Sequence, residues 1–135
     1  MIKTIILNNL KAIGIQLLLC VLIFILLIIP NIFMNFFMYI IFLVISSLLT
    51  FVVYFFSGKY ILQDTGYFFG NIASVASLVI AVLFLTFFHA WGLPIHIILL
   101  IVEYSSYPYI LGGISVIIAL FIPSVTIFFG MKTQN

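Results

Sequence analysis

Three side chains in the second half of the chain have the chemistry to bind a metal ion or to move a proton. His89, His96 and Glu103 follow one another at intervals of seven residues, and two imidazoles with a carboxylate could hold a divalent cation or relay a proton. The spacing matches no known ligand signature, and Gly92 and Pro94 interrupt any helix that would align the three side chains. We therefore interpret them as a polar rim at a membrane interface, with metal binding and proton transfer as the alternatives.

The sequence contains none of the motifs that membrane enzymes commonly use. It has no Gly-x-Ser-x-Gly, no His-Glu-x-x-His, no phosphate-binding glycine loop and no pair of neighbouring carboxylates. Ser105 and Ser106 stand close to Glu103 but make no triad with it. We expect Glu103 at the depth of the lipid headgroups, although carboxylates inside a membrane are usually functional. The sequence therefore predicts no catalysis, no cofactor and no bound metal.

The composition assigns the chain to a membrane. Of its 135 residues, 67% are hydrophobic and only 4% are charged, whereas soluble domains carry about 25% charged residues. Because so few polar groups cannot cover a soluble surface, the composition excludes a soluble globular domain, a disordered chain and a nucleic-acid-binding protein. The single cysteine, Cys20, has no partner for an intramolecular disulfide. We expect residues 1–135 to form one integral membrane domain.

Four apolar stretches are long enough to cross a bilayer. About 20 apolar residues span a hydrocarbon core of about 30 Å, and in lipid they must be helical to satisfy their own backbone. The expected transmembrane helices are 12–29, 32–56, 67–91 and 110–130. The fold class is therefore an all-α, four-transmembrane-helix bundle, with the first helix stopped by Pro30 and Asn31 and the fourth kinked at Pro123. The first nine residues either lie in the inner interface or extend the first helix.

A short segment separates the third and fourth expected helices. The apolar part of residues 95–106 is too short to cross the bilayer, and it is followed by Glu103, two serines and Pro108. We interpret this stretch as a re-entrant or interfacial segment. The alternative is a fifth, short crossing, which would place the carboxyl terminus on the opposite side of the membrane.

The lysines predict the orientation in the membrane. With four crossings and the amino terminus inside, all four lysines fall on the cytoplasmic side, which is the positive-inside pattern. We therefore expect a multi-pass protein of the cell membrane with both termini cytoplasmic, and the bias towards Ile, Phe, Asn and Tyr suggests a bacterial source. The charged residues are Lys3, Lys11, Lys59, Lys132, Asp64 and Glu103.

Small residues recur at spacings of three and four along the third expected helix, a pattern that lets helix backbones approach closely in lipid. This small-residue stripe consists of Gly66, Gly70, Ala73, Ser74, Ser77 and Ala81. The fourth expected helix carries a second set, Gly112, Ser115, Ala119 and Pro123. We predict that the two sets pack antiparallel against each other within one chain. The alternative is that the stripe packs against a second copy.

Two asparagines would be costly to bury in lipid without a partner. Asn35 lies in the second expected helix, and Asn71 lies near the start of the third, beside the small-residue stripe. We expect Asn71 to hydrogen bond to a neighbouring helix, and the alternative is that it binds a substrate or an ion. Hydroxyl side chains on the second helix are expected to bond to carbonyls of their own helix. They are Ser46, Ser47 and Thr50.

The sequence favours a non-catalytic function within the bilayer. Its loops are too short to form a soluble domain, and its small residues offer packing surface instead of chemistry. Our hypothesis is an accessory or interaction subunit, with the lipid bilayer and a larger membrane protein, or a second copy, as expected partners, and with no nucleic acid. The alternative is a small homo-oligomeric channel or transporter in which Asn35, Asn71 and Glu103 line a path.

Overall fold

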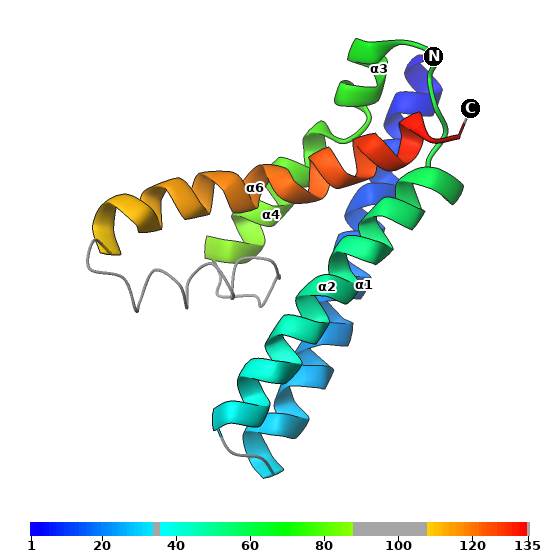
Figure 1. Ribbon diagram of the computed structural model, residues 1–135. Helices are drawn as coiled ribbons and strands as arrows, with labels where there is room; N and C mark the ends of the chain where they lie inside the picture. The colour runs from blue at the N-terminus through cyan, green and yellow to red at the C-terminus, as the bar shows by residue number, and fades with distance from the viewer. Residues whose placement is uncertain (34–35, 88–107, 135) are drawn as a thin grey trace.

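The computed structural model describes residues 1–33, 36–87 and 108–134, and within these ranges every regular element is an α-helix. The helices are α1 (Ile2–Phe33), α2 (Phe36–Tyr60), α3 (Phe68–Ala73), α4 (Ala76–Phe87) and α6 (Pro108–Lys132) (Figure 1). The prediction of an all-α chain is confirmed for the part that the structure describes. The expected short segment 95–106 lies outside the described residues.

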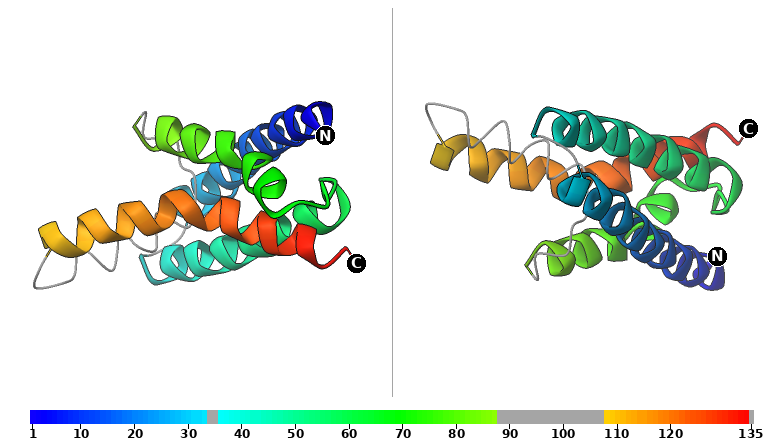
Figure 2. Two further views of the ribbon diagram at one scale, coloured as in Figure 1. Left: turned by 90° about the horizontal axis from the view of Figure 1, so that it is seen from above. Right: turned by 90° about the horizontal axis from the view of Figure 1, so that it is seen from below.

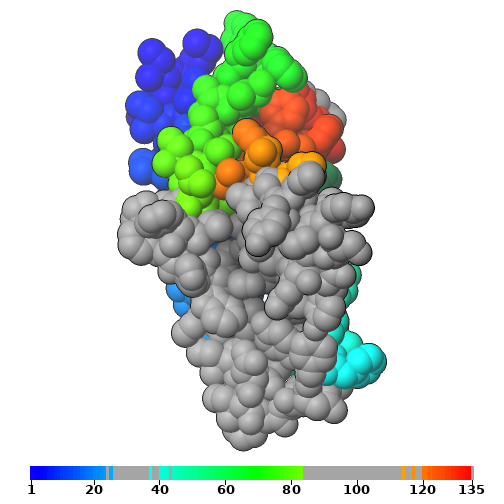
Figure 3. Space-filling view, turned by 90° about the vertical axis from the view of Figure 1, so that its left-hand side faces the viewer, coloured from blue at the N-terminus to red at the C-terminus, as the bar shows by residue number. Residues whose placement is uncertain are grey.

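The helices contact one another in a ring. α1 packs on α2, α2 on α6, α6 on α4, and α4 back on α1. Figure 2 shows α6 lying between α2 and α4 from both directions of view. On the face shown in Figure 3, α3 and α4 lie between the start of α1 and the C-terminal half of α6. Every element of the described chain therefore takes part in one helical assembly.

Both termini and the loop of residues 61–67 lie together at one end of the molecule (Figure 1). We call this end the charged end, because it carries all the charged residues that the structure describes. They are Lys3, Lys11, Lys59, Asp64 and Lys132. Lys11 Nζ donates a hydrogen bond to the carbonyl of Ile61 at 3.0 Å, which ties the start of α1 to this loop.

The first helix is longer at both ends than its apolar run predicts. It begins at Ile2, ten residues before the expected start, so the first nine residues extend the helix. It also continues through Pro30 to Phe33, and the expected stop at Pro30 and Asn31 is wrong. Proline removes one backbone donor and its ring crowds the carbonyl four residues earlier, but the residues after it can still donate to carbonyls one turn earlier, so the helix can continue. The second helix begins and ends about four residues later than expected, at Phe36–Tyr60.

The third expected helix is divided into two. α3 ends at Ala73, Ser74 and Val75 form a turn, and α4 begins at Ala76. In the turn, the amide of Val75 bonds to Ile72 at 3.2 Å and that of Leu78 bonds to Val75 at 3.1 Å, which is the tighter three-residue spacing. A continuous helix over 67–91 is therefore wrong at this point, and residues 88–91 lie outside the described chain.

In the part of the chain that the structure describes, two helical stretches are long and apolar enough to cross a membrane, judged by length and composition. They are Ile2–Ile23 and Ile40–Tyr60. Shorter apolar helical stretches are Phe68–Leu83 and Leu120–Lys132. α6 contains Pro123 in its interior, as the sequence places it.

The described interior is nearly as polar as it is apolar. Nine buried side chains are polar or charged and ten are hydrophobic. The apolar core includes Ala12, Leu19, Tyr54, Leu62, Val75, Leu78, Val82, Ile127 and Met131. Many large apolar side chains point outward instead, and Ile80, Leu18 and Phe37 are each 69% exposed. Soluble proteins bury such side chains preferentially, so this distribution suits an apolar surrounding.

α2 and α6 approach most closely at two glycines that lie at the charged end. A Cβ atom on Gly130 would stand 2.1 Å from the carbonyl oxygen of Phe55 and 3.0 Å from the Cα of Gly58. A Cβ atom on Gly58 would stand 2.1 Å from the carbonyl oxygen of Ile127. All of these neighbours are backbone atoms, so the two helices could not keep this contact with any larger residue at either position.

Candidate functional site

Four of the predicted functional residues, Asn35, His89, His96 and Glu103, lie outside the described residues. Within the described ranges, no group of three His, Cys, Asp or Glu side chains could hold a metal ion. Gly112, Ser115 and Ala119 belong to α6, but their side chains are not among those described. Of the candidates, the structure therefore places Asn71 and the small-residue stripe.

Asn71 is fully buried in α3 and holds the loop that precedes it. Its Nδ2 donates to Asp64 Oδ1 at 2.7 Å. Its Oδ1 accepts from the backbone amide of Thr65 at 2.9 Å and from the Thr65 hydroxyl at 2.8 Å. The expected partner on a neighbouring helix is wrong: these bonds all go to the 61–67 loop, because the turn before α3 folds back over the first turn of the helix.

Asp64 is the charged centre of this loop. Its Oδ1 accepts from Asn71 and also from the backbone amide of Gly66 at 2.8 Å. Gly66 has φ +75°, a left-handed conformation that glycine adopts without strain. The hydrogen bond from Asn71 and then that from Gly66 hold the pKa of the Asp64 carboxyl below its ordinary value, against desolvation, which raises it. The charge of Lys132 lowers this pKa further and is the smallest of the four effects.

This lowered pKa predicts a pH dependence. A carboxyl whose pKa is depressed on folding contributes stability above its unfolded pKa and loses it as the pH falls through the folded value. The pH window therefore begins near 3.8 and extends below it. We expect Asn71→Ala, which removes the largest cause, to raise the pKa of Asp64. Carbon-13 NMR titration of the carboxyl measures this directly, and an unchanged pKa in the variant would contradict the assignment.

Asn8 of α1 binds the same loop from the other side. This fully buried side chain donates from Nδ2 to the carbonyl of Gln63 at 2.8 Å and accepts at Oδ1 from the Gln63 amide at 3.1 Å. Its Nδ2 also donates to Ser74 Oγ at 3.2 Å. The amide of one asparagine thus satisfies both backbone groups of a loop residue and reaches the α3–α4 turn.

Asn9 occupies the break between α3 and α4. In a continuous helix the amide of Ser77 would bond to the carbonyl of Ala73. Instead, Asn9 Nδ2 donates to the Ala73 carbonyl at 2.7 Å, and Asn9 Oδ1 accepts from the Ser77 amide at 3.0 Å and from its hydroxyl. A side chain inserted into the hydrogen-bond ladder is a recognised cause of a helix kink, and it accounts for the division of the third expected helix.

The contacts described for the small-residue stripe go to α1 and to the loop, whereas the side chains of Gly112, Ser115 and Ala119, which are among its predicted partners, are not described. Its members Ser74 and Ser77 hydrogen bond to Asn8 and Asn9 of α1. Its member Gly70 packs against the loop, since a Cβ atom there would stand 2.4 Å from Thr65 Oγ1. Larger residues of α3 and α4 meet α6 instead: the rings of Phe68 and Phe128 lie edge to face at 5.4 Å. α3 and α4 both contact α6, as expected, and the pairing of the two small-residue sets stays a prediction.

The carboxyl terminus joins the same cluster. Gln134 Nε2 donates to the carbonyls of Gly58 and Leu62 at 2.7 Å and 2.6 Å, and its Oε1 accepts from the amide of Asp64 at 3.1 Å. The bond to Gly58 satisfies a carbonyl that the end of α2 leaves free, and the bond to Leu62 satisfies one in the loop that follows. We call the whole set the amide clamp. Its side chains are Asn8, Asn9, Asp64, Thr65, Asn71, Ser74, Ser77 and Gln134.

A second group of buried polar side chains lies deeper, between α1 and α2. The hydroxyl of Tyr54 donates to Gln16 Oε1, and Gln16 Nε2 donates to Cys20 Sγ at 3.5 Å. One turn away, the Thr50 hydroxyl bonds to the carbonyl of Ser46 at 2.7 Å, so the bond expected within this helix is confirmed for Thr50. The Gln16–Tyr54 pair links the two helices at a depth where unpartnered polar groups are costly.

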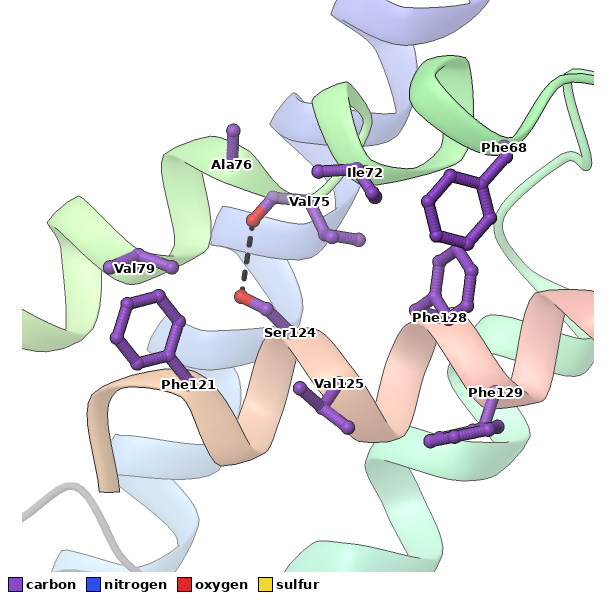
Figure 4. Close-up of a pocket in the computed structure, with 10 residues that line it drawn as sticks. All are labelled: Phe68, Ile72, Val75, Ala76, Val79, Phe121, Ser124, Val125, Phe128 and Phe129. Atoms are coloured by element: carbon purple, nitrogen blue, oxygen red, sulfur yellow. Dashed lines mark hydrogen bonds between the residues drawn. The ribbon is translucent and has the colours of Figure 1, made fainter. Parts of the chain in front are cut away.

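An apolar groove runs between α3–α4 and α6, with a volume of about 490 Å³. Figure 4 shows Phe68, Phe128 and Phe129 at one end of the groove and Val79 and Phe121 at the other. The Ser124 hydroxyl in its floor donates to the Val75 carbonyl at 3.2 Å. Because that polar atom is already partnered, the groove offers apolar contact to whatever enters it.

The buried polar side chains of the described chain hold its helices and loop together. In the described chain, every buried side-chain nitrogen or oxygen has a hydrogen-bond partner, and in the amide clamp these partners tie one helix or loop to another. Reasoning from the sequence missed Asn8 and Asn9, whose signal was an adjacent asparagine pair inside an apolar helix. No protein-family model, no curated protein and no solved structure matches the chain.

Proposed function

We propose that the chain is a four-crossing protein of the cell membrane that works as a non-catalytic accessory subunit inside the bilayer. α1, α2, α3–α4 and α6 are the four crossings, and both termini face the cytoplasm. The charged end supports this orientation, since it combines four lysines with the two termini and the 61–67 loop. Lysine-rich loops and ends are retained on the cytoplasmic side.

The accessory role is supported by one observation above the others. The buried polar groups of the described chain are engaged with the chain's own backbone and side chains, while the outer surface presents large apolar residues such as Ile80, Leu18 and Phe37. Such a protein can recognise a partner only through apolar packing or through its charged end. Both fit a subunit that binds another membrane component without transforming it.

A homo-oligomeric channel or transporter is the second candidate, and the polar group between α1 and α2 favours it. Gln16, Ser46, Ser47 and Thr50 are all buried, and a row of amides and hydroxyls is the lining that a polar path through a membrane requires. In a channel these residues would face a shared pore. In an accessory subunit their role is to hold α1 on α2.

Crosslinking separates the two functions. Membranes are crosslinked, the tagged chain is purified in mild detergent, and copurified proteins are quantified by mass spectrometry. We expect a stoichiometric larger membrane protein, which Asn71→Ala should retain if the amide clamp is structural and the variant remains folded. Recovery of the chain alone or with copies of itself would overturn the accessory role and favour the channel, which ion flux into liposomes would then test.

The four-crossing topology gives a separate prediction. In a Cys20→Ser background, Gln63→Cys in the loop and Thr133→Cys after α6 introduce thiols at exposed positions of the charged end. We expect a membrane-impermeant maleimide to label both only after the cytoplasmic side is opened, because positive-inside orientation places both there. Labelling of one of them in intact cells would contradict the four-crossing topology.

A further inference from the structure

The groove between α3–α4 and α6 is short compared with a membrane. Its α6 wall runs from Phe121 to Phe129, which is about 12 Å of helix at 1.5 Å per residue. A hydrocarbon core about 30 Å thick gives each leaflet about half of that depth. The groove therefore suits an occupant confined to one leaflet better than a helix that crosses both.

The charged end lies at one mouth of the groove. Phe128 and Phe129 form that mouth, and Lys132 follows Phe128 by four residues, so its side chain projects from the same face of α6 one turn further on. Lys132 is exposed, and so is Phe69, whose ring lies 5.6 Å from that of Phe68 in the groove lining. A cation and aromatic rings at the end of an apolar channel match the headgroup region of a bilayer.

We propose that the groove binds one anionic phospholipid of the cytoplasmic leaflet. An acyl chain lies against Ile72, Val79 and Val125, and the phosphate of the headgroup meets the ammonium group of Lys132. The volume of about 490 Å³ lies within the usual range of small-ligand pockets. The proposal rests on the membrane placement proposed above, but it does not depend on whether the chain is an accessory subunit or a channel.

The charges around the mouth are compatible with this assignment. Asp64 is the one acidic side chain among the described residues; its Oδ1 is bound by Asn71 and by the Gly66 amide, and the charge of Lys132 has the smallest effect on its pKa. Lys59, the other lysine at the ends of α2 and α6, lies over the ring of Tyr60 at 5.4 Å from its centroid. Lys132 is thus the cation placed to meet a headgroup at the groove.

Native mass spectrometry of the delipidated protein in detergent tests the proposal. The full chain is titrated with phosphatidylglycerol and with phosphatidylcholine that carries the same acyl chains. We expect one bound lipid per chain and about a fivefold preference for phosphatidylglycerol, as one lysine near an anionic headgroup should give. Lys132→Gln should remove the preference, whereas Lys59→Gln should keep it.

A second pair of variants tests the groove itself. Ala76 lines it, and Ile80 lies one turn further along α4, exposed and outside the lining. We expect Ala76→Phe to weaken the binding of both lipids about tenfold or more, since the acyl chain loses its place, and Ile80→Phe to leave it unchanged. Thermal unfolding of Ala76→Phe and Ile80→Phe checks that both variants are folded.

Three outcomes would overturn the lipid site. The first is an equal loss of lipid binding in Ala76→Phe and Ile80→Phe, and the second is competition by glycerol 3-phosphate that is as strong as competition by the lipid. The third is that the parent chain is a dimer and Ala76→Phe a monomer, with lipid binding unchanged. The last would assign the groove to a second copy. A failed lipid test with a larger partner still recovered by crosslinking would leave the accessory function standing, so the two proposals fail separately.

Discussion

Gly130→Ala is expected to lower the free energy of unfolding by about 3 kcal/mol, the upper part of the range for overpacked sites. The added Cβ atom would stand 2.1 Å from the carbonyl oxygen of Phe55 and 3.0 Å from the amide nitrogen of Lys59. Both neighbours are backbone atoms of α2, so no side chain can rotate away. The two helices must separate, and with them the bonds that Gln134 makes to the end of α2.

Gly14→Ala is the matched control. Gly14 lies within α1, and nothing stands within 4 Å of the position that its Cβ atom would take. Because alanine is the better helix former by about 0.5–1 kcal/mol, we expect this variant to be as stable as the parent or slightly more stable. Reversible unfolding of the detergent-solubilised chain measures both. Equal stability of the two variants would show that α2 and α6 do not meet at Gly130.

The Gly58–Gly130 contact between α2 and α6 and the small-residue stripe together show what the spacing of small residues can predict and what it cannot. The stripe was prominent because its members recur every three or four residues, and small residues do pack closely there. Spacing does not identify the neighbour, however, and the stripe packs on α1 and the loop. Gly58 and Gly130 stand singly near the ends of α2 and α6. Their contact depends on how two distant helices cross, which no local pattern records.

The helices themselves were predictable from apolar runs, and their ends were less so. Runs of apolar residues located α1, α2 and α6 because a helix in an apolar setting must be apolar along its length. The sequence alone did not decide the start of α1, since Lys3, Asn8 and Asn9 fit an interfacial segment as well as an extension of the helix. Asn8 and Asn9 can lie inside a helix because their side-chain amides hydrogen bond to the carbonyls of Gln63 in the loop and of Ala73 beside the α3–α4 turn.

The candidate site was predictable only in part for a related reason. Asn71 was identified as a buried amide in need of a partner, and it is fully buried. Its partners, Asp64 and Thr65, lie seven and six residues before it in a loop. The cost of burying an amide predicts that a partner exists, but which partner depends on how the loop folds.

Asn9→Ala is expected to have the second large effect, a loss of about 2–4 kcal/mol of unfolding free energy. The variant removes the bonds of Asn9 to the Ala73 carbonyl and to the Ser77 amide. A backbone group left unpartnered where it is fully buried costs about 1–3 kcal/mol, and this variant leaves two such groups in part-buried positions. Amide hydrogen exchange at Ser77 should become faster at the same time, which reports on the break itself.

Gln63→Ala provides the control, because the Gln63 side chain is exposed and only its backbone bonds to Asn8. We expect it to change stability by less than about 0.5 kcal/mol. If Asn9→Ala were as stable as this control and exchange at Ser77 stayed slow, the Ala73 carbonyl and the Ser77 amide would have bonded directly. α3 and α4 would then be one helix that Asn9 merely touches. A destabilised variant with fast exchange shows instead that α1 holds α3 and α4 in their bent arrangement, so that the start of α1, the 61–67 loop and the α3–α4 turn are stable only together.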